Sequence, residues 1–463
     1  MVITCATAGS TLVRVNLPVE ALRGYTLYGY AHVKAENVSH RPQSWNGIKV
    51  MAVVESPAGK GWAQARVPEG TFDWQEVTLA GRIPADATGL TLCLGLEAVS
   101  GKAWFDDVRI VVGKVPVSPV PTNGDGPMFR GVDLPRLRGA MIHPGIDEAG
   151  LRTLGRDWGA NVIRWQLVRT GPAAKLATVE EYDAWLEGQL KRLDAMLPLC
   201  RKYGVYVVLD LHSPWGGQPT AGGYAGSDGG LFTRKACQEH FVTGWKQMAT
   251  RYKAAKEIWG YDLVNEPVEG VVAPDCDDWH GLATRAAKAI RAVDADRAII
   301  VEPNEGGGPE ALADFPPIDA ANVVYSVHMY VPGAFTHQGV FDPKTPAYRY
   351  PGKIAGQDWD KAALDKVLAP VVAYQKKYHV AIYVGEFSAI RWAPDQSALR
   401  YLTDVIDLFE AHGWDWSYHA FREWPGWSVE YPEDRVATQP ARNPTERQKL
   451  LMRWYAKNQK PAW

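Results

Sequence analysis

The sequence contains no long hydrophobic run. None of its apolar stretches approaches the ~20 residues that a helix needs to cross a bilayer. The opening MVITCATAGS lacks the basic start and the apolar core of a signal peptide. We therefore expect no membrane partner and no signal peptide within these 463 residues.

Cysteine and net charge are also scarce. The cysteines are scattered without a close pair, which predicts neither a disulfide framework nor a zinc site; they are Cys5, Cys93, Cys200, Cys237 and Cys276. The 50 basic and 52 acidic side chains leave a formal net charge of −2, which argues against nucleic acid as a partner. In contrast, 19 tryptophans and 20 tyrosines are present. Their rings either fill the core or stack on sugar rings.

The N-terminal part consists of short alternating apolar and polar runs that Gly, Pro, Asn and Asp separate. This period-two pattern predicts an antiparallel β-sandwich over residues 1–112. Its last two runs, PADATGLTLCLGLE and GKAWFDDVRIVV, resemble the carbohydrate-binding β-sandwich modules that accompany polysaccharide-degrading enzymes. The resemblance implies a fold more than a binding activity. Trp45, Trp62 and Trp74 are either a sugar-binding platform or part of the core.

A proline-rich segment, GKVPVSPVPTNGDGP, follows the predicted sandwich. Prolines among small and polar residues favour an extended linker, which we place at residues 113–128. The remaining residues, 129–463, are long enough for a second and larger domain.

Strand-like and helical segments alternate in this second domain. Eight apolar runs have strand length: GAMIHP, NVIRWQLV, VYVVLDLH, IWGYDLVNE, AIIVEPN, NVVYSVHMY, AIYVGEF and WDWSYHAF. Helical spacing of apolar residues predicts helices at 179–202, 234–253, 278–293, 361–377 and 396–412, and a weakly marked one near 308–314. This alternation predicts an α/β fold of the (β/α)8 type, the TIM barrel.

Most of the predicted strands end in polar or ionisable residues. In a TIM barrel the active site lies at the C-terminal ends of the strands. The residues delivered there are Arg164, Asp210, His212, Asn265, Glu266, His328, Tyr330, Glu386, His419 and, slightly later, Trp424. Because buried polar groups are costly without partners, their convergence predicts a functional site. We interpret Asp210 as structural, and Glu302 and Glu305 as structural or rim groups.

Two glutamates stand at equivalent positions on separate strands. Glu266 ends the run YDLVNEP directly before Pro267, and Glu386 follows Gly385 in AIYVGEFSAI. Two carboxylates across a cleft, without a cluster of metal-ligand spacing, point to glycoside hydrolysis that needs no metal or cofactor. Carboxyl groups ~5 Å apart would retain the anomeric configuration, whereas ~6.5–9.5 Å would leave room for water and inversion.

The motifs VIRWQLV, LDLH, DLVNEP, VHMY with FTHQG, and YVGEFS resemble, in order and spacing, those of glycoside hydrolase family 5, the cellulase and mannanase family. The resemblance implies a retaining mechanism in which Glu266 is the general acid/base and Glu386 is the nucleophile. It further implies that Arg164 and Tyr330 orient the nucleophile.

The same resemblance implies that His212 and Asn265 contact the sugar at the cleavage point and that His328 supports the acid/base. Many members carry a tryptophan in the eighth strand, where this chain has His419. We therefore expect Trp424, and after it Trp427, to be the stacking platform.

The expected function is that of a retaining, endo-acting β-glycanase, an endo-β-1,4-glucanase or cellulase that acts as a monomer on β-linked plant polysaccharide or oligosaccharide. A β-mannanase and an exo-acting β-glucosidase or glucanase remain open, because loops such as the glycine-rich segment 215–232 set the subsites. A noncatalytic carbohydrate-binding protein is a further alternative, although binding alone needs no acid opposite a nucleophile. The substrate predicts a secreted or extracellular protein.

Overall fold

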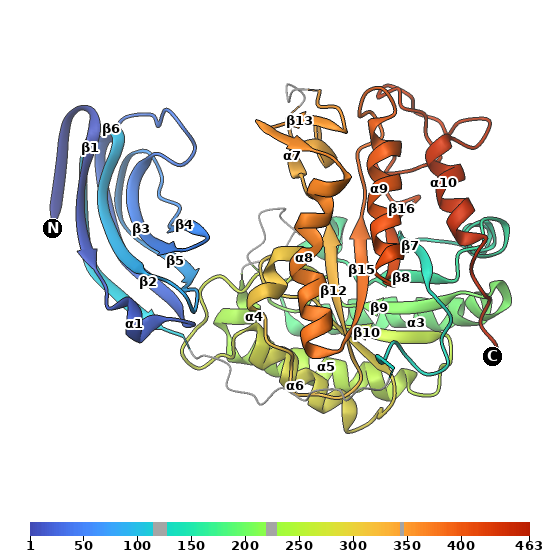
Figure 1. The fold of residues 1–463 in the computed structure, drawn as a ribbon. Coiled ribbons are helices and arrows are strands. Elements are labelled where there is room, and N and C mark those ends of the chain that lie inside the picture. Colours follow the sequence, from blue (N-terminus) through green and yellow to red (C-terminus); the bar gives the residue numbers. More distant parts are fainter. Residues whose placement is uncertain (114–126, 219–228, 343–346) are drawn as a thin grey trace. The chain divides into compact units, whose positions relative to one another are not determined.

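The computed structural model describes residues 1–113, 127–218, 229–342 and 347–463 (Figure 1). The chain divides into two compact units, Met1–Val117 with Gly270–Asp278, and Ser118–Glu269 with Trp279–Trp463. Most of the predicted linker at 113–128, and the central part of the glycine-rich segment at 215–232, lie outside the described residues.

The N-terminal unit is a curved antiparallel sheet (Figure 1). Its elements are β1 (Val2–Asn16), α1 (Val19–Leu22), β2 (Thr26–Val38), β3 (Gly47–Ser56), β4 (Gly59–Gln64), β5 (Gly70–Arg82) and β6 (Gly89–Val112). The strand order is β4-β3-β6-β2-β5, and β1 also pairs with β6. One core of alternating apolar side chains, including Val33, Val50 and Leu94, lies inside the curve.

The long strand β6 joins what the sequence pattern predicted as two separate runs. Its first half pairs with β3 and its second half with β2. Gly101 lies where β6 passes from one partner to the other, at φ +124°. A Cβ atom there would come within 2.6 Å of Val38 Cα, so the close approach of the two strands requires glycine.

The second unit contains a closed barrel of eight parallel strands, as the sequence predicted. The strands are β7 (Arg138–Ile142), β8 (Val162–Gln166), β9 (Tyr206–Asp210), β10 (Ile258–Asp262), β11 (Ala298–Val301), β12 (Val323–Met329), β15 (Ala381–Phe387) and β16 (Asp415–Phe421). Their order is β10-β11-β12-β15-β16-β7-β8-β9. The strands are almost continuously buried, which explains why their sequences read as unbroken apolar runs.

Helices follow the strands around the barrel (Figure 1). The longer ones are α3 (Val179–Tyr203), α5 (Lys235–Tyr252), α6 (Trp279–Arg291), α8 (Lys361–Tyr378), α9 (Ser397–Ala411) and α10 (Glu446–Tyr455). The weakly marked helix near 308–314 is a short 3-10 helix, η3 (Pro309–Asp314). A capping box begins α3, because Thr178 accepts from the Glu181 amide and Glu181 accepts from the Thr178 amide.

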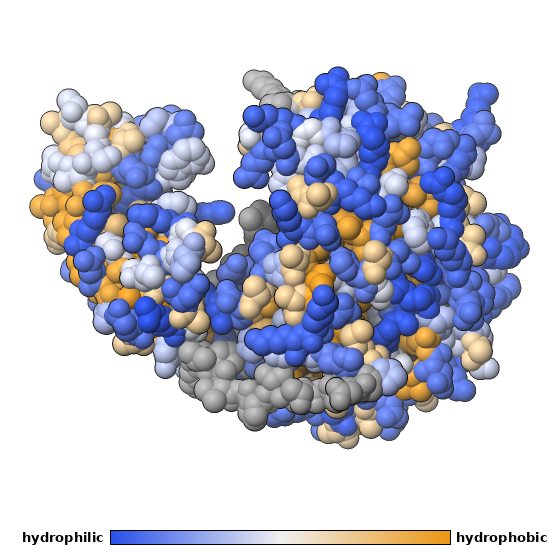
Figure 2. Space-filling model, viewed as in Figure 1, coloured by the Kyte–Doolittle hydropathy of each residue, from blue (hydrophilic) through white to orange (hydrophobic). Residues whose placement is uncertain are grey.

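Short elements complete the second unit. They are α2 (Glu148–Leu151), the π-helix η1 (Arg152–Asp157), the 3-10 helix η2 (Gly171–Lys175), α4 (Gly230–Thr233), α7 (Gly333–Thr336), and the hairpin of β13 (Gly352–Ile354) and β14 (Gln357–Trp359). Among the described residues, no helix combines the length and the apolar character that a membrane crossing needs. The visible face of this unit is largely hydrophilic, with hydrophobic residues in small patches (Figure 2).

The two ends of the barrel differ in polarity. A cluster of apolar side chains fills the end at which the strands begin; it includes Leu137, Val162, Trp259, Ile300 and Tyr383. This packed end provides the rigid base of the barrel. The polar residues predicted from the sequence lie at the opposite end, where the strands finish.

Candidate active site

Arg164 is the centre of the polar end of the barrel. It projects from β8 and is fully buried. Its guanidinium donates to Glu386 Oε1 at 2.6 Å, to Asp262 Oδ2 at 2.9 Å and to Glu302 Oε1 at 3.1 Å. Asp210 Oδ1 lies 3.3 Å away. A buried arginine is stable only with such partners, so Arg164 ties the ends of several strands together.

The buried carboxyl groups around Arg164 influence one another. Burial raises the pKa of Asp262 well above its usual range; the charge of Arg164 opposes this effect, and the charges of Glu302 and Asp210 add to it.

Glu386, on β15, is held in the ionised form. Tyr330 donates its hydroxyl to Glu386 Oε2 at 2.9 Å, while Arg164 donates to the other oxygen. Burial alone would raise the pKa of this carboxyl, but the positive charges of His328, His419 and Arg164 outweigh it and hold the pKa well below the usual range. Glu386 is thus a carboxylate at neutral pH, with both oxygens fixed in place.

Glu266 enters the site from the segment that follows β10. Its backbone has φ +45°, in the left-handed region that residues with a side chain seldom adopt. Its amide donates to Glu302 Oε2 at 2.9 Å, and its Oε1 lies 2.8 Å from His328 Nδ1. The side chain is 28% exposed, in contrast to the nearly buried Glu386. These contacts point the carboxyl group into the mouth of the barrel.

His328 links the two glutamates. Besides its contact with Glu266, its Nε2 lies 3.1 Å from Glu302 Oε1. Burial would lower the pKa of this ring, but the negative charges of Glu302 and Glu386 raise it well above the usual range. The ring is thus surrounded by carboxylates, which favour its protonated form.

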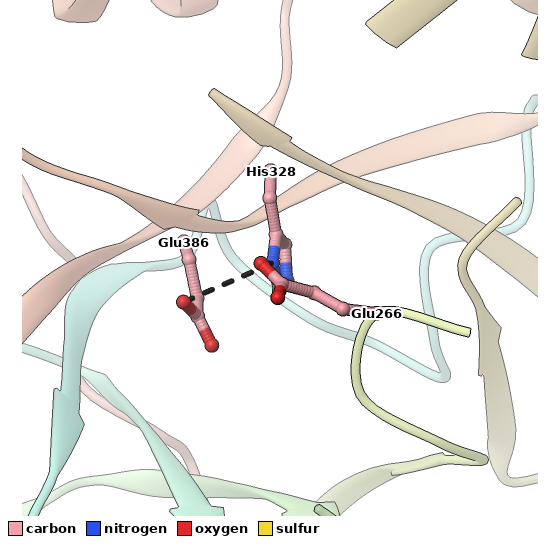
Figure 3. A group of neighbouring side chains, drawn as sticks. All are labelled: Glu266, His328 and Glu386. Carbon is pink, nitrogen blue, oxygen red and sulfur yellow. Dashed lines mark hydrogen bonds and ion pairs between the residues drawn. The ribbon is translucent and has the colours of Figure 1, made fainter. Parts of the chain in front are cut away.

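The carboxyl groups of Glu266 and Glu386 face each other across a short gap (Figure 3). One oxygen of each, and one ring nitrogen of His328, lie within 4.8 Å of one another. This spacing would also suit a metal ion.

The remaining predicted residues lie at the same end of the barrel. Asn265 is buried, and its Oδ1 accepts from Arg164 at 3.1 and 3.2 Å. His212 Nδ1 lies 2.8 Å from Asp210 Oδ2. Trp424 is 38% exposed and lines a cavity of about 400 Å³ together with Glu266 and Glu386. The structure therefore brings all eight predicted side chains to one mouth.

The sequence interpretation left the place of Glu302 open, as a structural or a rim group, and missed Glu423. Glu302 is fully buried between Arg164, His328 and the Glu266 amide, and so it does not lie at the rim. Glu423 was not singled out, yet its Oε2 lies 3.2 Å from His419 Nε2. Glu302 lies within the fifth predicted run, AIIVEPN, directly after β11 ends, and that position was the signal available. Nothing local marks Glu423, which comes two residues after β16 ends.

Comparison with known proteins agrees with this geometry. The family model described as cellulase (glycosyl hydrolase family 5) matches residues 126–423, well over half of the chain. The chain belongs to glycosyl hydrolase family 5. Its barrel is accordingly the catalytic fold of a glycosyl hydrolase.

Relatives of this family 5 chain include curated enzymes and solved structures. Endoglucanase C of Acetivibrio thermocellus is 30% identical over 262 residues, 50% of this chain and 73% of that protein. Cellodextrinase A of Ruminococcus flavefaciens is 25% identical, over 58% of this chain and 76% of that protein. A glycoside hydrolase structure has a TM-score of 0.55 at 25% identity, covering 69% of this chain and 99% of the other.

The Thermotoga maritima Cel5A structure in complex with cellobiose has a TM-score of 0.54 at 23% identity. It covers 68% of this chain and 97% of that chain. At this level of identity the similarity establishes the barrel fold of the family 5 domain.

Proposed function

We propose that this chain is a retaining, endo-acting β-1,4-glucanase that uses Glu386 as nucleophile and Glu266 as general acid/base. The separation of the two carboxyl groups carries the proposal. Their nearest oxygens lie within 4.8 Å, which suits the ~5–5.5 Å of retaining glycosidases and falls short of the ~6.5–9.5 Å of inverting ones.

In the first step Glu386 attacks the anomeric carbon while Glu266 gives its proton to the glycosidic oxygen. The bond to the leaving sugar breaks, and a glycosyl ester of Glu386 forms. In the second step Glu266 takes a proton from water, the resulting hydroxide attacks the anomeric carbon, and Glu386 departs as a carboxylate. Both side chains end in their starting protonation states.

The neighbouring contacts suit these roles. Arg164 and Tyr330 hold the two oxygens of Glu386 and stabilise the charge that the nucleophile needs before attack. His328 Nδ1 lies 2.8 Å from Glu266 Oε1 and holds the acid/base in place. Asn265, held by Arg164, is placed beside the acid/base to bond the 2-hydroxyl of the reacting sugar.

The names of the relatives support a β-glucan substrate, since endoglucanases and a cellodextrinase are among them. A β-mannanase and an exo-acting β-glucosidase or glucanase use the same mechanism. A noncatalytic binding protein would not need an ionised carboxylate opposite a second carboxyl group.

A panel of polysaccharides with product sizing tests this function. Carboxymethylcellulose, mixed-linkage β-glucan, mannan and 4-nitrophenyl β-cellobioside are each incubated with the full chain. We expect a rapid fall in the viscosity of carboxymethylcellulose, soluble oligosaccharides of several lengths, and a β-anomer as the first product by proton NMR. Release of single sugars alone would point to exo action, hydrolysis of mannan alone to a mannanase, and no product from any substrate would refute catalysis.

We also propose that residues 1–112 form a carbohydrate-binding module, separated by the linker at 113–128 from the barrel domain at 129–463. Trp62 on β4 and Trp45 before β3 are 65% and 61% exposed. The buried Lys49 donates to the Trp45 carbonyl and to Gln64 Oε1 at 2.8 Å, and pairs with Glu97 at 2.7 Å. This network holds the Trp45 segment over the sheet face that carries Trp62 and Gln64.

Substitution of these tryptophans tests the module. The double variant Trp45→Ala, Trp62→Ala is expected to reduce binding to insoluble cellulose by about tenfold, because stacking on sugar rings is lost. Hydrolysis of 4-nitrophenyl β-cellobioside should stay the same. The control is Val15→Ala, which removes an exposed apolar side chain from the opposite sheet face. If insoluble cellulose removes the same fraction of the wild type, the double variant and the control from solution, sugar binding at this face is refuted.

A further inference from the structure

Two cavities meet at Glu386. The larger one, of about 400 Å³, is lined by Glu266 and Tyr330 and by aromatic side chains that include Trp424 and Trp427. The smaller one, of about 160 Å³, is lined by Met141, His143, Gln166, Val168, Thr170, His212, Glu386, His419 and Glu423. Glu386 and His419 border both cavities, whereas Glu266 borders only the larger of the two.

The positions of the two glutamates assign a side of the substrate to each cavity. In the proposed mechanism the acid/base protonates the leaving oxygen, so the departing sugar lies on the Glu266 side, in the larger cavity. The sugar that becomes bonded to Glu386 lies on the other side. The smaller cavity therefore receives the glycone, the part of the substrate that forms the covalent intermediate.

Seven of the nine residues that line the smaller cavity have polar or ionisable side chains, and the other two are Met141 and Val168. None of its lining residues in the described chain is tryptophan, tyrosine or phenylalanine. His419 occupies the end of β16, where a stacking ring was expected from the family resemblance, and Trp424 lies in the other cavity. Recognition of the glycone must therefore rely on hydrogen bonds more than on stacking.

Glu423 is the acceptor on the outer wall of this cavity. Its side chain is 26% exposed, and its Oε2 lies 3.2 Å from His419 Nε2. This oxygen is buried against the His419 ring, so the exposed part of the side chain lies elsewhere. Burial would raise the pKa of Glu423, but His419 and a hydrogen bond from Gln166 lower it. The charges that face Glu423 are those of His419 and Glu386, on β16 and β15.

The charges of Glu386 and Glu423 both act on the His419 ring. Burial lowers the pKa of its ring, while Glu386 and Glu423 raise it above the usual value. Its Nδ1 lies 3.6 Å from Glu386 Oε2. The His419 ring lies near both carboxylates, and each of them keeps acceptor capacity for sugar hydroxyls, which are good donors to charged oxygens.

We propose that Glu423 is a specificity-determining residue of the glycone side, where it accepts a hydrogen bond from a ring hydroxyl of the sugar that becomes bonded to Glu386. The inference rests on the proposed function and adds the identity of the group that selects the glycone. It predicts a hydroxyl-bearing pyranose, recognised at one position by a carboxylate.

Deoxygenated substrates test this contact. We would measure kcat/KM of the full chain and of Glu423→Gln on 4-nitrophenyl β-cellobioside and on analogues that lack the 2-, 3- or 6-hydroxyl of the reacting ring. The wild type should lose about 10- to 100-fold on the 3- or the 6-deoxy analogue, as expected for a hydrogen bond to a charged group. On the parent substrate, kcat/KM of Glu423→Gln should be lower than that of the wild type by a similar factor. Removal of the same hydroxyl should then lower kcat/KM of this variant by less than about threefold further.

Two comparisons separate this contact from a structural role. The 2-deoxy analogue should lose the same factor in both proteins, because that hydroxyl is assigned to Asn265. Glu430→Gln is the matched control, since Glu430 pairs with Arg422 in the same loop and lines neither cavity. It should behave as the wild type on every substrate.

The outcomes are distinguishable. Equal losses of wild type and Glu423→Gln on every deoxy analogue would overturn the inference, because Glu423 would then act only through His419. Glu423→Asp keeps the charge, so it should lose activity on the same deoxy analogue as the wild type. The unfolding temperatures of all variants are measured to exclude misfolding. A wild type that releases no product from any substrate of the panel would overturn the proposed function itself.

Discussion

Replacement of Glu386 by alanine is expected to lower kcat on 4-nitrophenyl β-cellobioside by about 10⁴-fold or more, the scale on which enzymes lose activity without their covalent nucleophile. Sodium azide should restore part of the activity, because it fits the space left by the carboxylate. The product should be the α-glycosyl azide, since one displacement inverts the configuration. Product analysis by proton NMR measures this outcome.

The fold should survive this substitution. Arg164 keeps Asp262, Asp210 and Glu302 as partners when Glu386 is removed. Glu305→Gln is the matched control, because Glu305 is an exposed carboxylate just beyond β11, and its activity should equal that of the wild type. Unchanged activity in Glu386→Ala, or rescue with retained configuration, would refute the assignment of the nucleophile.

Replacement of Glu266 by alanine is expected to lower kcat/KM on carboxymethylcellulose by about 10²- to 10⁴-fold, the usual contribution of a general acid/base. A 2,4-dinitrophenyl leaving group departs without a proton, so the first step on that substrate should hardly change and the glycosyl ester should accumulate. Azide should then speed turnover and give the β-glycosyl azide. Burst kinetics and product NMR measure both effects.

The pH profile separates the two glutamates further. Glu386 reacts in its ionised form, and its pKa lies well below the usual value. Activity should therefore fall on the acid side only below the ordinary glutamate pKa of about 4.3. Glu266→Ala should lose the alkaline limb of the profile and keep the acid limb. An alkaline limb that persists in this variant would contradict the role of Glu266 as the proton carrier.

The charges at the mouth of the barrel are compatible with the two proposed roles of carboxyl groups that lie within 4.8 Å of each other. Two like carboxylates so close repel each other unless cations intervene. Arg164 neutralises the inner side of Glu386, and the His328 ring lies against both Glu266 and Glu386. Glu302 completes the arrangement, since it binds Arg164, faces His328 and holds the backbone amide of Glu266.

The sequence predicted much of the fold because each strand of the barrel is buried on both sides. A strand of this kind reads as an unbroken apolar run, and the helices between strands show their own spacing. The prediction was inaccurate only at particular segments. The helix at Pro309–Asp314 is too short to show a period, and the two runs of β6 were separated at Gly101, where the chain continues as one strand.

The sequence by itself determined which residues stand at the strand ends, and hence that Glu266, Glu386 and Arg164 share one mouth of the barrel. Only the tertiary structure decided how far apart the two carboxyl groups lie, which charges lower the pKa of Glu386, and that Glu302 and Glu423 lie beside them. Distances across a barrel depend on strand register and tilt, and pKa values depend on burial and on charges from other strands. Neither is written in the local pattern of any one segment.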